Sequence, residues 1–230
     1  MFDGKMKAVT FSYDDGLTQD LRVIDFLDKY GLKCTFNISS GCFGKDHYLT
    51  INDTEVKHFY VNPSELSQIY KNHEIASHAL THENLFYLTD EEIIQQVEED
   101  RINLEDMTGR EIVGFAYPGG GFDGRTAEVL KHRTGVKYAR TALPTLGFSR
   151  PANPYIWYPT ENYRFLMNNC MYLVDEFLNA NPNEPMVLYI WGHGYEHDAY
   201  NDWEQFEEFC KHISGRDDIF YGTNREILGI

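Results

Sequence analysis

The alternation of short apolar segments with amphipathic ones is the feature that most restricts the fold of this 230-residue chain. Seven apolar segments are predicted as strands: residues 7–12, 33–38, 74–77, 112–117, 138–141, 186–191 and 219–221. Helical segments between such strands are typical of a parallel sheet covered by helices. We therefore expect one α/β domain over residues 1–230. Periodicity alone does not decide whether the sheet closes into a barrel.

The predicted helices follow from capping signals and from the spacing of apolar residues. They cover residues 20–30, 89–108, 124–132, 165–179 and 203–212, and a further helix starts at residue 62. In the first helix, Leu21, Ile24 and Leu27 are expected to share one buried face. Thr89 and Glu92 have the spacing of a capping box, which marks the start of the longest helix.

Composition and charge limit the class of partner. The formal net charge is −16 and no basic patch is visible, which argues against a nucleic-acid partner. No apolar run approaches the roughly 20 residues of a membrane span, so no membrane partner is expected. The sequence does not indicate an oligomeric state.

The N-terminus and the cysteines bear on location. The first residues show no signal-peptide pattern, and Cys34, Cys42, Cys170 and Cys210 lack CxxC spacing. Free thiols in the cytoplasm are therefore expected. An extracellular or envelope location is the alternative if a leader has been removed.

Polar residues follow the predicted strands where a ligand site belongs. Asp14 and Asp15 follow the first strand, His78 follows the third, and His193 follows the sixth. In barrels and in open parallel sheets alike, ligands bind at the carboxyl ends of the strands. These side chains are therefore expected to lie near one another.

Two adjacent carboxylates in "TFSYDDG" repel each other and require a cation or another partner. His78 and His82 are four residues apart, so on a helical turn both imidazoles could reach one ion. Two histidines and one carboxylate form a set that leaves coordination positions open for water and substrate. One aspartate would then bind the cation and the other would act as a general base. The alternative is structural, with Asp14 capping a turn and Asp15 paired with Lys or Arg.

A second histidine pair, His193 and His197, has the same spacing but a different context. Glycines flank His193 on both sides, which argues against a helix at this point. The helical-turn argument is therefore not applied to this pair.

Four segments, "TFSYDDG", "SHALTH", "FAYPGG" and "YIWGHGYE", occur in the order of the motifs of the polysaccharide deacetylase family, carbohydrate esterase family four. The resemblance runs from about residue 7 to residue 197. It implies a distorted (β/α) barrel, often with seven parallel strands. It also implies metal-dependent hydrolysis that removes acetyl groups from carbohydrates.

The resemblance assigns roles to particular residues. Asp14 matches the catalytic base, and Asp15, His78 and His82 match the metal ligands. His193 matches the general acid. The family's metal is usually zinc, with cobalt or nickel as other possibilities.

The charged partners of the family's catalytic residues are not evident in this chain. Ala116 stands where the family carries an arginine that pairs with the base, and we expect Arg140 to replace it. The acidic partner of His193 is also missing from its usual motif, so Glu161 or Asp198 is expected to substitute.

The pocket residues also depart from the family pattern. Gly119 stands where tyrosine is common and would supply a backbone N–H to the oxyanion, beside Tyr117. Residues 143–161 hold four of the eight prolines and are predicted as a long ordered loop. In this loop Trp157 is a candidate for the pocket wall, and Trp191 is a candidate for the acetyl-methyl pocket. Ala79 replaces the serine or threonine that usually follows the first histidine, so Thr81 is expected to brace that loop.

The resemblance implies a carbohydrate partner. The expected activity is removal of N-acetyl groups from a glycan that contains N-acetylglucosamine, such as peptidoglycan or chitin oligomers. An O-acetyl xylan esterase is the alternative within enzymes. A catalytically silent glycan-binding protein is the alternative outside them.

Overall fold

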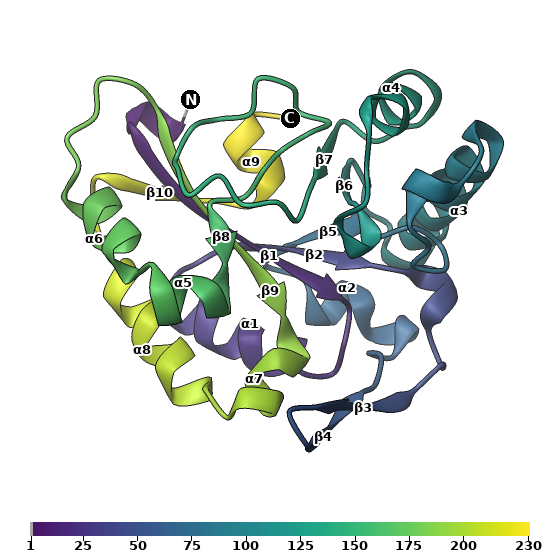
Figure 1. The fold of residues 1–230 in the computed structure, drawn as a ribbon, viewed down its shortest axis with the longest axis horizontal. Coiled ribbons are helices and arrows are strands. Elements are labelled where there is room, and N and C mark those ends of the chain that lie inside the picture. Colours follow the sequence, from purple (N-terminus) through teal and green to yellow (C-terminus); the bar gives the residue numbers. More distant parts are fainter. Residues whose placement is uncertain (1) are drawn as a thin grey trace.

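The computed structural model describes residues 2–230, which form one parallel sheet surrounded by helices (Figure 1). Seven strands follow the order β7-β6-β5-β2-β1-β9-β8, and β10 pairs with β1 outside this path. Every pairing in this sheet is parallel. The strands are β1 (Lys7–Asp15), β2 (Cys34–Ile38), β5 (Glu74–Ser77), β6 (Gly114–Ala116), β7 (Tyr138–Arg140), β8 (Glu161–Asn162), β9 (Met186–His193) and β10 (Ile219–Tyr221).

The sheet is wound into a distorted barrel, as the family resemblance implied, and the predicted long loop completes it. The backbone N–H of Trp157 donates to the Ala139 carbonyl at 2.9 Å, so this segment extends the edge at β7. A few residues later, the N–H of Thr160 donates to the Tyr189 carbonyl of β9 at 2.8 Å. Residues 157–162 thus link the edge of the sheet at β7 to the edge at β8 and β9.

The helices cover the outside of the sheet (Figure 1). They are α1 (Asp20–Lys29), α2 (Leu66–Ile69), α3 (Asp90–Thr108), α4 (Gly124–Arg133), α5 (Tyr163–Asn169), α6 (Met171–Asn179), α7 (Gly194–Tyr200), α8 (Trp203–Ile213) and α9 (Asn224–Leu228). The predicted capping box of Thr89 and Glu92 opens α3, and Gly109 ends it with a φ of 67°. Both features satisfy backbone groups at the helix ends that lack partners within the helix.

Three expectations about helices are wrong. Leu21 is 49% exposed, and Val23 joins Ile24 and Leu27 on the buried face of α1. The helix predicted over residues 165–179 is two helices, which meet at Cys170. A helix, α7, begins directly after His193, because a glycine at the first position of a helix does not prevent the following residues from forming it.

The apolar core and the barrel interior share the two faces of β1. Val9, Phe11 and Tyr13 pack in the largest hydrophobic cluster, beneath the helices. Thr10, Ser12 and Asp14 alternate with them and point to the interior, where the buried polar side chains bond to one another. Asn37 of β2, for example, donates to Ser12 Oγ at 2.8 Å. The interior therefore provides polar partners for a charged group at the end of β1.

An antiparallel hairpin that the sequence reading missed follows β2. Its strands are β3 (His47–Ile51) and β4 (Thr54–His58), and it lies below the carboxyl end of β1 in Figure 1. Asn52 and Asp53 form its turn with φ of 49° and 61°. Such φ values at both central positions are typical of a type I′ hairpin turn, and Asn-Asp was the available sequence signal.

Two further expectations concern the cysteines and membranes. The four cysteines are free and buried. Within residues 2–230, none of the helices combines the length and the apolar character needed to cross a membrane.

Candidate active site

The two acidic residues of the first motif end β1, and the backbone separates their side chains. Asp14 is the last residue of β1 to pair with β9, opposite His193. Asp15 follows with a φ of 84°, in the left-handed region that non-glycine residues rarely adopt. Backbone strain of this kind persists where the surrounding structure holds it, and it gathers at functional sites.

Asp14 is buried and held by two donors. Nη2 of Arg140 contacts both carboxylate oxygens, and Asn37 Nδ2 donates to Oδ1 at 2.7 Å. Burial alone would raise the pKa of Asp14, but the positive charge of Arg140, with smaller effects of His78 and His193, lowers it below its usual value. Asp14 is therefore ionised at neutral pH.

Arg140 contacts Asp14 from β7, one strand away from Ala116, the position at which the family's arginine was expected. In the pairing of β6 with β7, Ala116 is the direct neighbour of Arg140. A side chain at position 140 of β7 therefore lies at the same height along the sheet as a side chain at position 116 of β6. The guanidinium also lies 4.8 Å from the ring centroid of Trp191, and Arg140 is 1% exposed. This is the placement that the sequence predicted for Arg140.

His78 presents one ring nitrogen to the site in a defined tautomer. Its Nδ1 donates to the Ala116 carbonyl at 2.8 Å, which leaves Nε2 without a proton. Burial lowers the pKa of His78 to about 4, so the imidazole is neutral, as metal binding requires. The buried carboxylate of Asp100 accepts from the Ser77 hydroxyl at 2.6 Å and from the His78 N–H at 3.2 Å, which fixes this backbone.

His82 reaches the same point through a tight turn, not through the helical turn that the spacing suggested. Residues 78–82 are not helical, and both Ala79 and His82 have φ near 60°. Gln96 of α3 braces the turn, because its side chain bonds to Thr81 and its carbonyl accepts from Leu80 N–H at 2.9 Å. The two imidazoles therefore approach the same point, as expected, but a non-helical turn brings them together and not a helical one.

Asp15, His78 and His82 form a group whose ligand atoms all lie within 4.8 Å of one another. Oδ1 of Asp15 is 3.8 Å from His78 Nε2 and 3.5 Å from His82 Nε2. Nearby histidines outweigh the effect of burial and lower the pKa of Asp15 far below its usual value. One ionised carboxylate and two imidazoles suit zinc and similar divalent cations, so the donor set fits the implied metal.

His193 lies across the cavity from this group. Its Nε2 is 4.0 Å from Asp14 Oδ2, and its Nδ1 is 3.5 Å from Glu196 Oε2. Burial opposes protonation, but the contact with Glu196 and the charges of Asp15 and Asp14 raise the pKa of His193 to about 9. The imidazole therefore carries a proton at neutral pH.

The acidic partner of His193 is Glu196, so the two candidates from the sequence are wrong. Glu161 accepts from the backbone N–H of Asn162, and Asp198 accepts from Gln19 and Trp203. The signal in the sequence was the spacing of three between His193 and Glu196, which matches a capping box at the start of α7. His197 instead lies in the core, bonded to Tyr13 and Asp202.

These groups surround a cavity of about 330 Å³, near the lower limit of small-molecule sites. Tyr117, Gly119 and Trp191 line it, as predicted, and Gly119 has a φ of 60°. Trp157 is absent from its described lining: the side chain is 1% exposed and packs against Tyr189 at a centroid distance of 4.4 Å. Trp157 therefore helps to close the barrel and does not form a pocket wall.

His58, the last residue of β4, also lines the cavity, and sequence reasoning missed it. Its Nε2 is 3.4 Å from Asp15 Oδ2. The residue belongs to none of the motifs, and only the missed hairpin brings it to the site. Asn37, which holds Asp14, was overlooked for a similar reason: it lies inside a strand that reads as buried.

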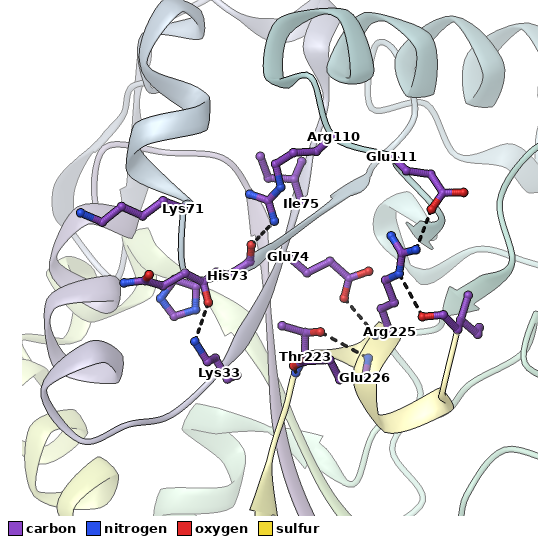
Figure 2. A pocket seen from close by; sticks show the side chains of 12 residues that line it. Lys33, Lys71, His73, Glu74, Ile75, Arg110, Glu111, Thr223, Arg225 and Glu226 are labelled. Atoms are coloured by element: carbon purple, nitrogen blue, oxygen red, sulfur yellow. Dashed lines mark hydrogen bonds and ion pairs between the residues drawn. The ribbon is translucent and has the colours of Figure 1, made fainter. Parts of the chain in front are cut away.

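A larger cavity, of about 520 Å³, lies at the opposite, amino-terminal end of the strands (Figure 2). Figure 2 shows that several of its charged groups are engaged with the protein itself. Arg110 donates to the carbonyl of His73, and Arg225 pairs with Glu111 at 2.6 Å. Buried Glu74 accepts from neutral donors, among them the Tyr138 hydroxyl at 2.9 Å. We interpret these contacts as the structure that joins α9 to the base of the barrel.

The fold and the site define a class: a parallel β/α barrel that carries a candidate cation site of one carboxylate and two imidazoles beside a buried Asp–Arg pair. The sequence profile of the polysaccharide deacetylase family matches residues 3–139 of the chain. The chain therefore belongs to the polysaccharide deacetylase family. No match was found among curated proteins.

Solved structures of similar fold include a T48 deacetylase with substrate, at a TM-score of 0.61 and 14% identity over 100% of this chain and 94% of that one. The peptidoglycan deacetylase PdaC from Bacillus subtilis gives a TM-score of 0.60 and 16% identity over 97% and 91%. Wild-type BA3943 from Bacillus anthracis, described as a CE4 family pseudoenzyme, gives 0.55 and 15% over 99% and 66%. The chain spans 55% of the Streptococcus pyogenes deacetylase PplD. At these identities the likeness shows the fold.

Proposed function

We propose that this protein is a metal-dependent deacetylase that hydrolyses the N-acetyl group of a glycan containing N-acetylglucosamine. The observation that carries the proposal is the joint presence, in one cavity, of three metal-ligand side chains, an ionised aspartate and a protonated histidine. Metal-dependent amide hydrolysis uses these parts: a cation, a base for water and an acid for the leaving amine.

Asp15, His78 and His82 would hold the divalent cation, and we expect zinc, with cobalt or nickel as substitutes. When bound, such a cation acts as a Lewis acid and lowers the pKa of water from about 16 towards about 7. Because His78 is neutral and directs Nε2 towards Asp15, two of the ligands are already in the required protonation state.

Asp14 accepts the proton of the attacking water in this proposal. Arg140 and Asn37 occupy Oδ1, and Arg140 also contacts Oδ2, so the carboxylate keeps one orientation. Oδ2 faces both His78 Nε2 at 3.9 Å and His193 Nε2 at 4.0 Å, which places the base between the cation site and the acid.

His193 delivers a proton to the departing amine nitrogen, and Glu196 keeps that proton available. A backbone N–H at Gly119 is our candidate donor to the carbonyl oxygen as it becomes negative. Trp191 and Tyr117 would border the acetyl group. The small cavity suits one acetylated sugar residue more than a longer segment.

Two other functions compete with this proposal. The same groups would hydrolyse an O-acetyl ester of xylan, because an ester has a better leaving group than an amide. The structural likeness to a CE4 family pseudoenzyme keeps a silent glycan-binding protein as the other candidate. In this chain, however, the proposed base, acid and three ligands are all present in one cavity.

The test is release of acetate from N-acetylated chitin oligomers, from peptidoglycan fragments and from acetylated xylan. We expect release from an N-acetyl substrate, its loss after dialysis against a chelator, and its recovery with Zn²⁺ or Co²⁺. Asp14→Asn should abolish turnover and leave the metal content intact, whereas exposed Asp106→Asn in α3 is the matched control. Turnover by D14N at the wild-type rate would refute the assigned base. Glycan binding without release would favour the silent alternative.

A further inference from the structure

We propose that His58 is a positioning residue that holds the carboxylate of Asp15 in the orientation needed to bind the cation. This inference rests on the proposed function, because it assigns a task within the same site. His58 lies on the β3–β4 hairpin, outside the motifs that identify the family, and it is 9% exposed.

The two oxygens of Asp15 face different partners. Oδ1 is 3.8 Å and 3.5 Å from the Nε2 atoms of His78 and His82, so it points to the cation position. Oδ2 points the other way and lies 3.4 Å from Nε2 of His58. A carboxylate can rotate about its bond to Cβ, and a donor on one oxygen limits that rotation. Partners of this kind, behind the ligands of a metal, typically set ligand orientation and metal affinity.

The backbone at Asp15 increases the need for such a partner. Its φ of 84° places the side chain on a strained segment, and Gly16 continues in the left-handed region with a φ of 69°. Strained conformations persist only where surrounding contacts determine them. His58 supplies a contact on the side of Asp15 that faces away from the other two histidines.

The hairpin is fixed to the end of β1 on both sides of this contact. The N–H of Thr18 donates to the Phe59 carbonyl at 2.8 Å, and the N–H of Val61 donates to the Gly16 carbonyl at 3.0 Å. These bonds join residues that lie within three positions of Asp15 and of His58 in the sequence. The position of His58 relative to Asp15 is therefore set by the backbone, not by a mobile loop.

The ring of His58 is also held by its neighbours. His47 of β3 lies 4.6 Å from it between ring centroids, and Tyr195 of α7 lies at 5.6 Å. A buried ring between two others keeps a single rotamer with little freedom. His58 is therefore a rigid neighbour of Asp15, with Nε2 3.4 Å from Oδ2.

The experiment measures metal affinity of the full chain, independently of turnover. The metal-free protein is titrated with Zn²⁺ in competition with a chromophoric chelator, and with Co²⁺ by its visible absorption spectrum. We expect His58→Phe to weaken Zn²⁺ binding by roughly 10- to 100-fold and to change the Co²⁺ spectrum. His58→Gln, which keeps an N–H donor near the position of Nε2, should restore part of the affinity. His132→Phe, an exposed histidine of α4 that pairs with Glu128, is the matched control and should bind Zn²⁺ like the wild type.

The outcomes separate this inference from the proposed function. If H58F binds Zn²⁺ as tightly as the wild type while His78→Ala loses it, the role of His58 is refuted and the metal site stands. If the wild-type chain binds neither metal, both proposals fail. Should H58F not fold, as judged by circular dichroism, His58→Ala replaces it in the comparison with H58Q.

Discussion

Replacing Arg140 by methionine tests the part of the site in which this chain departs most from its family. Methionine retains much of the volume of arginine but removes the positive charge that contacts both oxygens of Asp14. Asp14 is 3% exposed, so water cannot take over the role of the guanidinium. Asn37 would remain as a neutral donor at 2.7 Å.

The expected magnitude follows from the burial of the pair. Removing one partner of a buried ion pair costs about 3–5 kcal/mol, because the other charge is left uncompensated. For a domain of this size, 1 kcal/mol shifts Tm by about 2–4 °C, so R140M should unfold roughly 6–20 °C lower. Part of this loss is avoided if Asp14 takes up a proton, but a protonated carboxyl is no longer a base. Loss of a general base lowers the rate by about 10²- to 10⁴-fold.

The assay combines thermal unfolding with the pH dependence of acetate release. Because the guanidinium lowers the pKa of Asp14 in the wild type, activity should decline only at low pH. In R140M the acidic limb of kcat/KM should move to higher pH, since burial then acts without a compensating charge. Arg133→Met is the control, because Arg133 is half-exposed and pairs with surface carboxylates.

A double variant makes the reasoning stricter. In Asp14→Asn/Arg140→Met no buried charge is left unpaired, so its Tm should exceed that of R140M. If R140M retains both the wild-type acidic limb and the wild-type Tm, Arg140 does not keep Asp14 ionised, and the account of the replaced arginine is wrong.

Two further predictions use the pKa values of buried groups. Glu196→Gln removes the charge that helps to raise the pKa of His193 to about 9, so the alkaline limb of kcat/KM should move to lower pH. The stability that the His193–Glu196 contact contributes is present below pH 6.5 and is lost as pH rises through about 9, so E196Q should lose this pH dependence of stability. Exposed Glu208→Gln is the control. An unchanged alkaline limb of kcat/KM in E196Q would contradict the assignment of Glu196 as the partner of His193. Burial raises the pKa of Asp20 well above its usual value, although the Tyr70 hydroxyl donates to it at 2.8 Å. The stabilising effect of the protonated carboxyl is therefore present at acidic pH and lost as pH rises through the raised pKa. The stability of Asp20→Asn, measured by urea unfolding, should fall less than that of the wild type as pH rises. Parallel plots of stability against pH for the two proteins would show that Asp20 is ionised when folded.

The sequence alone was sufficient for the fold class, and its motifs contain residues that the structure brings into one cavity. Short apolar strands between helices specify a parallel sheet, and such a sheet places Asp14, Asp15, His78 and His193 at one edge. The pairing of Arg140 with Asp14 was also expected, because the family resemblance implied a cation beside this aspartate.

What the sequence could not supply were contacts between segments whose local pattern carries no signal. Glu196 lies at the start of a helix and Asn37 lies inside a strand, and both positions are common for such residues in any fold. Neither position by itself indicated a contact with His193 or Asp14. Trp157 appeared to be a pocket residue, yet backbone bonds to β7 bury it. His58 depends on a hairpin of exposed residues, for which hydrophobic periodicity is weak.

There is a physical reason why the sequence predicted the fold but not these contacts. Strand and helix patterns depend on neighbours within a few residues, so the chain itself determines which side chains reach the carboxyl edge of the sheet. The direction, protonation and partners of those side chains depend on charges and donors brought from distant segments into a region of low dielectric. The side chains available for chemistry were therefore decided by the sequence, and the arrangement of the proposed base, acid and three ligands around one cavity was decided only by the tertiary structure.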